Sequence, residues 1–146
     1  MGSFMPFRQE ETNPTILLVE DDAIVAAYIG DILGELQFVV VGIASTGPEA
    51  LSIAEINRVH LALVDVRIAG PMSGIELAQQ LHWRFNIPTI FLAEPTDPAH
   101  NLAAETTQPL RHIGMPFRAS NAYNTICAVL GHAKEPFSSP MSSSVS

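Results

Sequence analysis

Two short apolar runs each end in acidic residues, and these residues carry the chemistry that the sequence predicts. The acidic run Glu20–Asp22 follows the apolar run Ile16–Val19, and Asp65 follows the apolar run Leu61–Val64. If the two runs form neighbouring parallel strands, the carboxylates meet at one edge of the sheet, within a few strand spacings of about 4.8 Å. Like charges that close repel, so the site must hold protons or bind a cation.

The available ligands favour magnesium over zinc. They are all hard oxygens, and no His or Cys stands at metal-ligand spacing beside them. An aspartate can attack phosphorus to give an acyl phosphate when a metal neutralises the phosphoryl group. Asp65 is the natural nucleophile because a loop follows it. The acids after the first run can instead cap the next helix, and Asp22 is the most plausible pure cap.

Short apolar runs alternate along the chain with amphipathic stretches. Strands are predicted at residues 16–19, 38–43, 61–64, 89–93 and 110–114. Helices are predicted from about 25 to 36, after the capping-box starts at Thr46 and Ser73, briefly near 100–104, and from about 120 to 130, where Gly131 ends the last one.

Such an alternation of five strands with five helices predicts an α/β fold. Continuous apolar strands indicate a parallel sheet, and right-handed crossovers place helices on both of its faces. We therefore expect a doubly wound α/β sandwich in which helices cover both faces of a five-stranded parallel sheet.

Composition predicts one domain with less regular ends. We expect a flexible segment over residues 1–14, a folded domain over 15–131, and a disordered Ser-rich tail over 132–146. The formal charge of −8 disfavours nonspecific binding to nucleic acid or anionic membranes. With no long apolar run and no signal-peptide pattern, a cytoplasmic location is expected.

Three other features favour structural roles. Cys127 lies in a helical pattern and is expected to be a buried thiol. Trp83 and Phe85 are expected to be packing residues. The five histidines lack metal-ligand spacing and are expected at the surface or in loops.

Four landmarks in chain order resemble the response-regulator receiver domain. They are ILLVEDD at 16–22, LVDVR at 63–67, GIELA at 74–78 and MPF at 115–117, and the resemblance covers about residues 15–130. It implies a flavodoxin-like sheet in the strand order 2-1-3-4-5, in which the first and third strands are neighbours, and it implies that Asp65 is the phosphoacceptor. It also implies that Mg²⁺ is bound by the carboxylates of Asp21 and Asp65, by Glu20 mostly through water, and by the backbone carbonyl of Arg67.

The same resemblance implies the partners. A histidine kinase or a histidine phosphotransfer protein would donate the phosphoryl group, and homodimerisation is possible. Because we expect no output domain after residue 131, an unknown downstream protein would receive the signal. The chain would be no enzyme beyond catalysing its own phosphotransfer and dephosphorylation.

The sequence departs from the receiver pattern at three positions. Ala93 stands where receivers usually have Thr or Ser, Met115 where they usually have Lys, and His112 where they usually have the aromatic residue that moves on activation. In receivers, the side chains of that Thr or Ser and of that Lys normally contact the phosphoryl oxygens. The only lysine, Lys134, lies beyond the last predicted helix. These departures predict weak or altered switching.

Two alternatives stay open beside the phosphoacceptor function. In the first, the chain is a degenerate receiver that binds a partner protein without phosphorylation. In the second, which the sequence disfavours, Asp65 serves a metal-dependent phosphatase. Phosphatases of the haloacid-dehalogenase type want a second Asp two residues later, where this chain has Arg67.

Overall fold

A computed structural model describes residues 13–94 and 112–131 of the chain. Its strands are β1 (Thr15–Val19), β2 (Val39–Ala44), β3 (Leu61–Asp65), β4 (Thr89–Ala93) and β5 (His112–Gly114). Its helices are α2 (Ala23–Glu35), α3 (Gly47–Ile56), α4 (Gly74–Phe85) and α6 (Ala119–Leu130).

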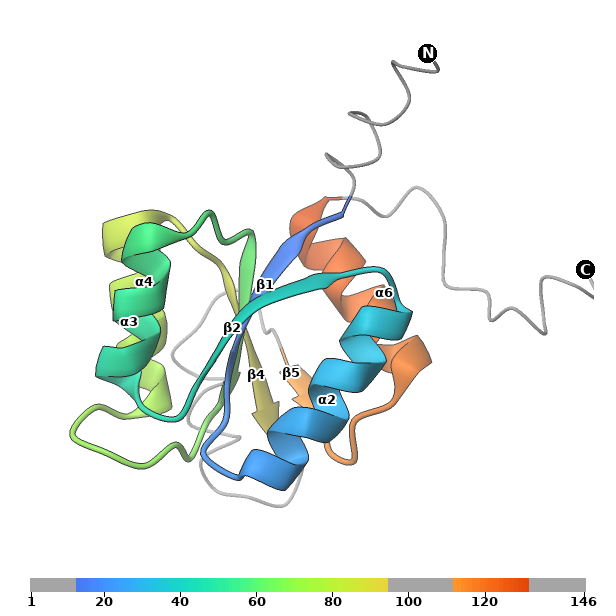
Figure 1. The fold of residues 1–146 in the computed structure, drawn as a ribbon, viewed down its shortest axis with the longest axis horizontal. Coiled ribbons are helices and arrows are strands. Elements are labelled where there is room, and N and C mark those ends of the chain that lie inside the picture. Colours follow the sequence, from blue (N-terminus) through green and yellow to red (C-terminus); the bar gives the residue numbers. More distant parts are fainter. Residues whose placement is uncertain (1–12, 95–111, 132–146) are drawn as a thin grey trace, which may run out of the picture.

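The five strands form one parallel sheet in the order β2-β1-β3-β4-β5. Figure 1 shows α3 and α4 on one side of this sheet and α2 and α6 on the other. The prediction of a doubly wound α/β fold with this strand order is confirmed. Strands β1 and β3 are direct neighbours, with Val19 opposite Val64.

The core consists of two apolar layers separated by the sheet. Alternate side chains of one strand enter different layers, since Leu17 packs with α3 and α4 whereas Leu18 packs with α2 and α6. Both leucines are fully buried. Full burial of a leucine side chain contributes roughly 1.5–3 kcal/mol, so the central strands fix the sheet edge on which the acidic residues lie.

Helix starts follow the predicted capping residues, with one difference. At α4 the Ser73 hydroxyl accepts from the Glu76 N–H and the Glu76 carboxylate accepts from the Ser73 N–H, both at 3.0 Å, which confirms a complete capping box. At α3, Glu49 instead accepts from the N–H of Ser45 at 2.8 Å and from its hydroxyl at 2.9 Å. Thr46 is the N-cap of α3, so the Glu49 carboxylate bonds to the residue before the cap instead of to the cap itself.

One structural prediction about a single residue is wrong. Trp83 is 79% exposed, because the core-facing stripe of α4 runs through Leu77, Ala78 and Leu81 and residue 83 lies off it. His60 lies in the loop before β3, as predicted, where it is half-buried and its Nδ1 accepts from the Thr15 N–H at 3.0 Å. Cys127 is buried, also as predicted.

Some predictions fall outside the described residues. These are the short helix near 100–104, the first two residues of the fifth strand, and the flexible ends at 1–14 and 132–146, apart from residues 13 and 14. The domain boundaries therefore stay predictions. Within the described ranges, no helix is long and apolar enough to cross a membrane.

Candidate metal centre

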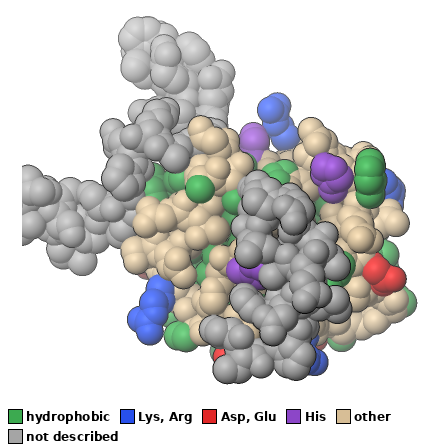
Figure 2. All heavy atoms as spheres, turned by 180° about the vertical axis from the view of Figure 1, so that it is seen from behind, with side chains coloured by type: hydrophobic (Ala, Val, Ile, Leu, Met, Phe, Trp, Pro, Cys, Tyr) green, Lys and Arg blue, Asp and Glu red, His purple; other side chains and the backbone are tan. Residues whose placement is uncertain are grey.

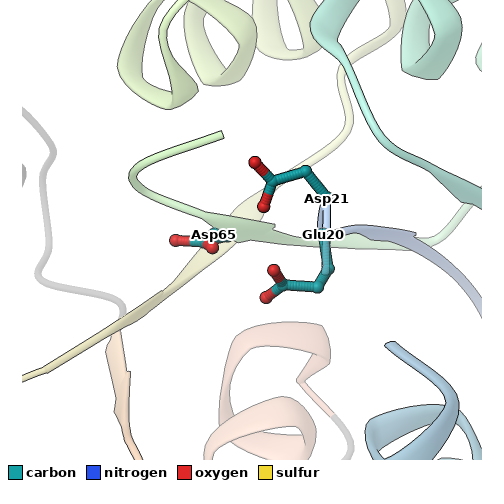
Figure 3. Close-up of side chains that lie close together, drawn as sticks. All are labelled: Glu20, Asp21 and Asp65. Carbon is teal, nitrogen blue, oxygen red and sulfur yellow. The ribbon is translucent and has the colours of Figure 1, made fainter. Parts of the chain in front are cut away.

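Three carboxylates converge where β1 and β3 end. Glu20, Asp21 and Asp65 each place one carboxylate oxygen within 4.8 Å of those of the other two. Figure 3 shows Glu20 and Asp21 leaving the end of β1 and Asp65 leaving the end of β3, with their carboxylate groups gathered on one side of the strand ends. The structure thus brings together the three acidic side chains predicted to bind metal.

Backbone hydrogen bonds hold these residues in place. The Glu20 N–H donates to the Ala44 carbonyl at 2.9 Å, which ties the end of β1 to the edge strand β2. The Asp65 Oδ1 accepts from the Arg67 N–H at 2.9 Å, so the turn after β3 orients the carboxylate. This bond also fixes the backbone around Arg67, whose carbonyl stays a predicted metal ligand.

Asp22 has a separate structural role. Its Oδ1 accepts from the N–H groups of Ile24 at 2.9 Å and Val25 at 3.2 Å, and it therefore caps α2, as the sequence predicted. Its own N–H donates to the Glu20 Oε2 at 3.0 Å. The cap and the metal centre are thus coupled through one peptide group.

Glu20 is the most perturbed group of the centre. Only 6% of the residue is exposed. The pKa of its carboxyl is raised from 4.5 to about 8, chiefly by burial and also by the charge of Asp65, while the hydrogen bond from the Asp22 N–H acts in the opposite direction. A buried carboxyl beside two others favours the protonated form until a cation arrives.

The donor set fits magnesium. It consists of oxygen atoms, and Asp21 is exposed while Asp65 is half-buried, so water molecules can complete the shell of an ion that retains several of them. A divalent cation would also offset the repulsion that disfavours an ionised Glu20. The residues present are therefore suited to hold Mg²⁺.

Gly74 shapes the site in a way that the sequence pattern did not reveal. A Cβ atom at this position would lie 2.9 Å from the Asp65 carbonyl oxygen and 3.0 Å from the Val66 Cα. Only glycine lets the start of α4 approach the end of β3 this closely. A glycine directly after a capping serine was the available signal, although only the fold shows which strand it meets.

Two of the three departures from the receiver pattern, Ala93 and Met115, lie at the same sheet edge, whereas His112 begins β5 opposite Phe91. Asp65 is opposite Leu92 in the register, and the following residue, Ala93, is opposite Gly114. The Met115 N–H donates to the Ala93 carbonyl at 3.3 Å, so residues 93 and 115 extend the edge beyond Asp65.

Their surroundings are apolar. Ala93 is 4% exposed, and half-buried Met115 packs against the layer formed with α2 and α6. The peptide bond from Met115 to Pro116 is cis. The ring of half-buried His112 lies 6.1 Å from that of Phe91.

Without divalent cations, we expect the free energy of unfolding to fall as the pH rises from about 5 to 8. The folded-state pKa of Glu20, about 8, lies above its ordinary value of 4.5, so over this window the folded chain holds a proton that the unfolded chain has released. One such proton gives a slope of about −1.4 kcal/mol per pH unit. Urea unfolding in a metal chelator at several pH values measures it, and Glu20→Gln should remove this component. Equal slopes for the two proteins would contradict the assignment.

Comparison with known proteins now identifies the class. The family described as "Response regulator receiver domain" matches residues 16–121, and this chain belongs to that family. The phyllosphere-induced regulator PhyR of Methylorubrum extorquens is 32% identical over 79% of this chain and 43% of its own length. The heme response regulator HssR of Staphylococcus saprophyticus is 32% identical over 80% of this chain and 51% of its own.

A solved structure agrees with the fold. The signal receiver domain of a modulated diguanylate cyclase from Desulfovibrio desulfuricans is 29% identical, with a TM-score of 0.75 over 82% of this chain and 94% of that one. The chain spans about half, or somewhat less, of the two curated relatives above. What it shares with them is therefore the receiver portion.

Proposed function

We propose that the chain is a phosphoacceptor receiver that is phosphorylated on Asp65 in the presence of Mg²⁺ and signals through protein contacts. One observation carries this proposal: Asp65 ends β3 with its carboxylate beside those of Glu20 and Asp21, all within 4.8 Å. Membership of the receiver family supports a role in two-component signalling. The names of the relatives, which are regulators, agree with such a role.

The chemistry requires one ionised oxygen on Asp65. That oxygen forms a bond to the phosphorus of a phosphohistidine on the donor protein while the phosphorus–nitrogen bond breaks, and the imidazole leaves with the electron pair and takes a proton from water. Mg²⁺ would neutralise the charge on the phosphoryl oxygens. The Arg67 N–H, which donates to Asp65 Oδ1, leaves Oδ2 as the oxygen for attack.

Charge distribution agrees with a protein partner. The formal charge of the chain is −8, and in Figure 2 the described Arg side chains lie apart from one another on that face. A scattered arrangement gives little attraction to the closely spaced phosphates of nucleic acid. We therefore propose a histidine kinase or histidine phosphotransfer protein as donor, a downstream protein as receiver of the signal, and a cytoplasmic setting.

Mass spectrometry after incubation with Mg²⁺ and acetyl phosphate tests this function. We expect wild type to gain the mass of one phosphoryl group and Asp65→Asn to gain none. Asp22→Asn is the matched control, because asparagine preserves the helix cap while removing an equal charge two residues from Glu20. Equal labelling of the wild type and Asp65→Asn, or labelling of neither, would contradict the proposal.

A second candidate function rests on Ala93, Met115 and His112. With these residues the chain would bind a partner without phosphorylation, because the groups that normally sense the phosphoryl oxygens are absent from their positions. In that case Asp65→Asn would leave partner affinity unchanged, and Mg²⁺ with acetyl phosphate would change it in neither protein. A calorimetric binding titration with an identified partner separates the two functions.

A further inference from the structure

Met115 places a neutral side chain next to the sheet edge on which the three carboxylates lie. The residue is half-buried, and its side chain packs against the apolar layer that contains Phe117 and Ile113. Its backbone is fixed by the hydrogen bond from its N–H to the Ala93 carbonyl. The position therefore carries a neutral side chain, held in place by packing on one side and by β4 on the other.

Residue 115 is close enough to the carboxylates for a charge on its side chain to affect them. Strands β3, β4 and β5 are consecutive neighbours, and residue 115 follows β5 at the edge where Asp65 ends β3. Two strand spacings separate the backbones by about 10 Å. A long side chain at residue 115 can bridge most of that separation, so a charge placed on it would act directly on Asp65 and on any cation beside it.

We propose that Met115 is an affinity-determining residue for the divalent cation: by leaving the carboxylates without a competing positive charge, it makes this site bind Mg²⁺ more tightly than it would with a cation at residue 115. The inference rests on the proposed Mg²⁺-dependent function. A lysine there would repel the metal and would pair with Asp65, and metal binding would then have to break that pair. With methionine at residue 115, the bound metal is the positive charge that offsets the repulsion among Glu20, Asp21 and Asp65.

The size of the effect follows from Coulomb's law. A unit charge about 6 Å from a divalent ion lowers its affinity by about tenfold even with the dielectric constant of water, and by more at a partly buried site. A negative charge at the same place has the opposite sign. Met115→Lys should therefore weaken Mg²⁺ binding at least about tenfold, and Met115→Glu should strengthen it.

Isothermal titration calorimetry with MgCl₂ at constant ionic strength tests the inference. Met115→Gln, which has a similar length and no charge, should bind Mg²⁺ like the wild type. Gln37→Lys is the control for overall charge, because this exposed residue follows α2 at the opposite edge of the sheet. Urea unfolding of each variant shows whether it is folded before the titration.

The outcomes separate this inference from the proposed function. Opposite shifts for Met115→Lys and Met115→Glu, with little change in the two controls, support it. Equal affinities for wild type and Met115→Lys, or equal losses for Met115→Lys and Gln37→Lys, overturn it while the metal-dependent phosphorylation of Asp65 still stands. A wild type that binds no Mg²⁺ overturns both.

Discussion

Replacing Glu20 and Asp21 together by Gln and Asn is expected to abolish measurable Mg²⁺ binding. Two of the three carboxylates that lie within 4.8 Å of one another lose their charge in this variant, and only Asp65 remains. Each ionised carboxylate about 4 Å from a divalent ion contributes roughly 2 kcal/mol even with the dielectric constant of water, so above the Glu20 pKa of about 8, where both are ionised, the pair is worth about a thousandfold in affinity. Calorimetric titration with MgCl₂ measures the loss.

The fold should survive this double substitution. A glutamine at residue 20 can still accept the hydrogen bond from the Asp22 N–H, and it removes the buried carboxyl whose pKa is raised to about 8. We therefore expect the variant without metal to be at least as stable as the wild type at pH 8. Loss of metal binding would then reflect the lost ligands rather than unfolding.

Asp22→Asn is the matched control for this prediction too. It removes one charge from the same acidic run, but its side chain caps α2, and asparagine caps equally well. Its Mg²⁺ affinity should fall far less than that of the double variant. Similar losses in the two proteins would mean that long-range charge, and not ligation by Glu20 and Asp21, governs binding.

The sheet and the acidic edge were predictable from sequence for one reason. Apolar runs such as Leu61–Val64 are buried on both faces, which only a covered parallel sheet permits, and the register of such a sheet brings strand ends together. The position of Asp65 beside Glu20 and Asp21 follows from that register. The residues alone predicted this meeting on the condition that the two strands are neighbours, and the family resemblance supplied the strand order and the roles of the residues.

Other features depend on tertiary packing and could not be read from spacing. Trp83 stands next to core-facing residues in sequence, yet the phase of α4 exposes it. His60 is half-buried because β1 and β3 are adjacent, which brings Thr15 within hydrogen-bonding distance. The close approach of Gly74 to the Asp65 carbonyl likewise requires knowing how α4 returns over β3.

The sequence predicted that one of the crowded carboxylates would have a raised pKa, but it did not predict that this residue is Glu20. Crowded carboxylates must hold protons or bind a cation, and the sequence showed the crowding. Which one holds the proton depends on burial, and Glu20 is 6% exposed whereas Asp21 is exposed. Burial therefore assigns the proton to the residue that the resemblance describes as the least direct metal ligand.

The double substitution Ala93→Thr with Met115→Lys is expected to speed the labelling of Asp65 by acetyl phosphate. By resemblance, these two side chains touch the phosphoryl oxygens, and the register places residues 93 and 115 at the same sheet edge as Asp65. A hydrogen bond to a charged group contributes roughly 1.5–3 kcal/mol, so one such bond formed in the transition state gives about a 10- to 150-fold faster reaction. Mass spectrometry at timed intervals measures the rate.

The metal concentration decides how this experiment is read. Since lysine at residue 115 is expected to weaken Mg²⁺ binding, the double variant must be compared with the wild type at Mg²⁺ concentrations that saturate both. Ala93→Ser with Met115→Gln adds the hydroxyl without the charge and should give a smaller increase. If both double variants react at the wild-type rate under saturation, the missing side-chain groups do not limit phosphorylation, and Mg²⁺ with the backbone around Asp65 suffices for it.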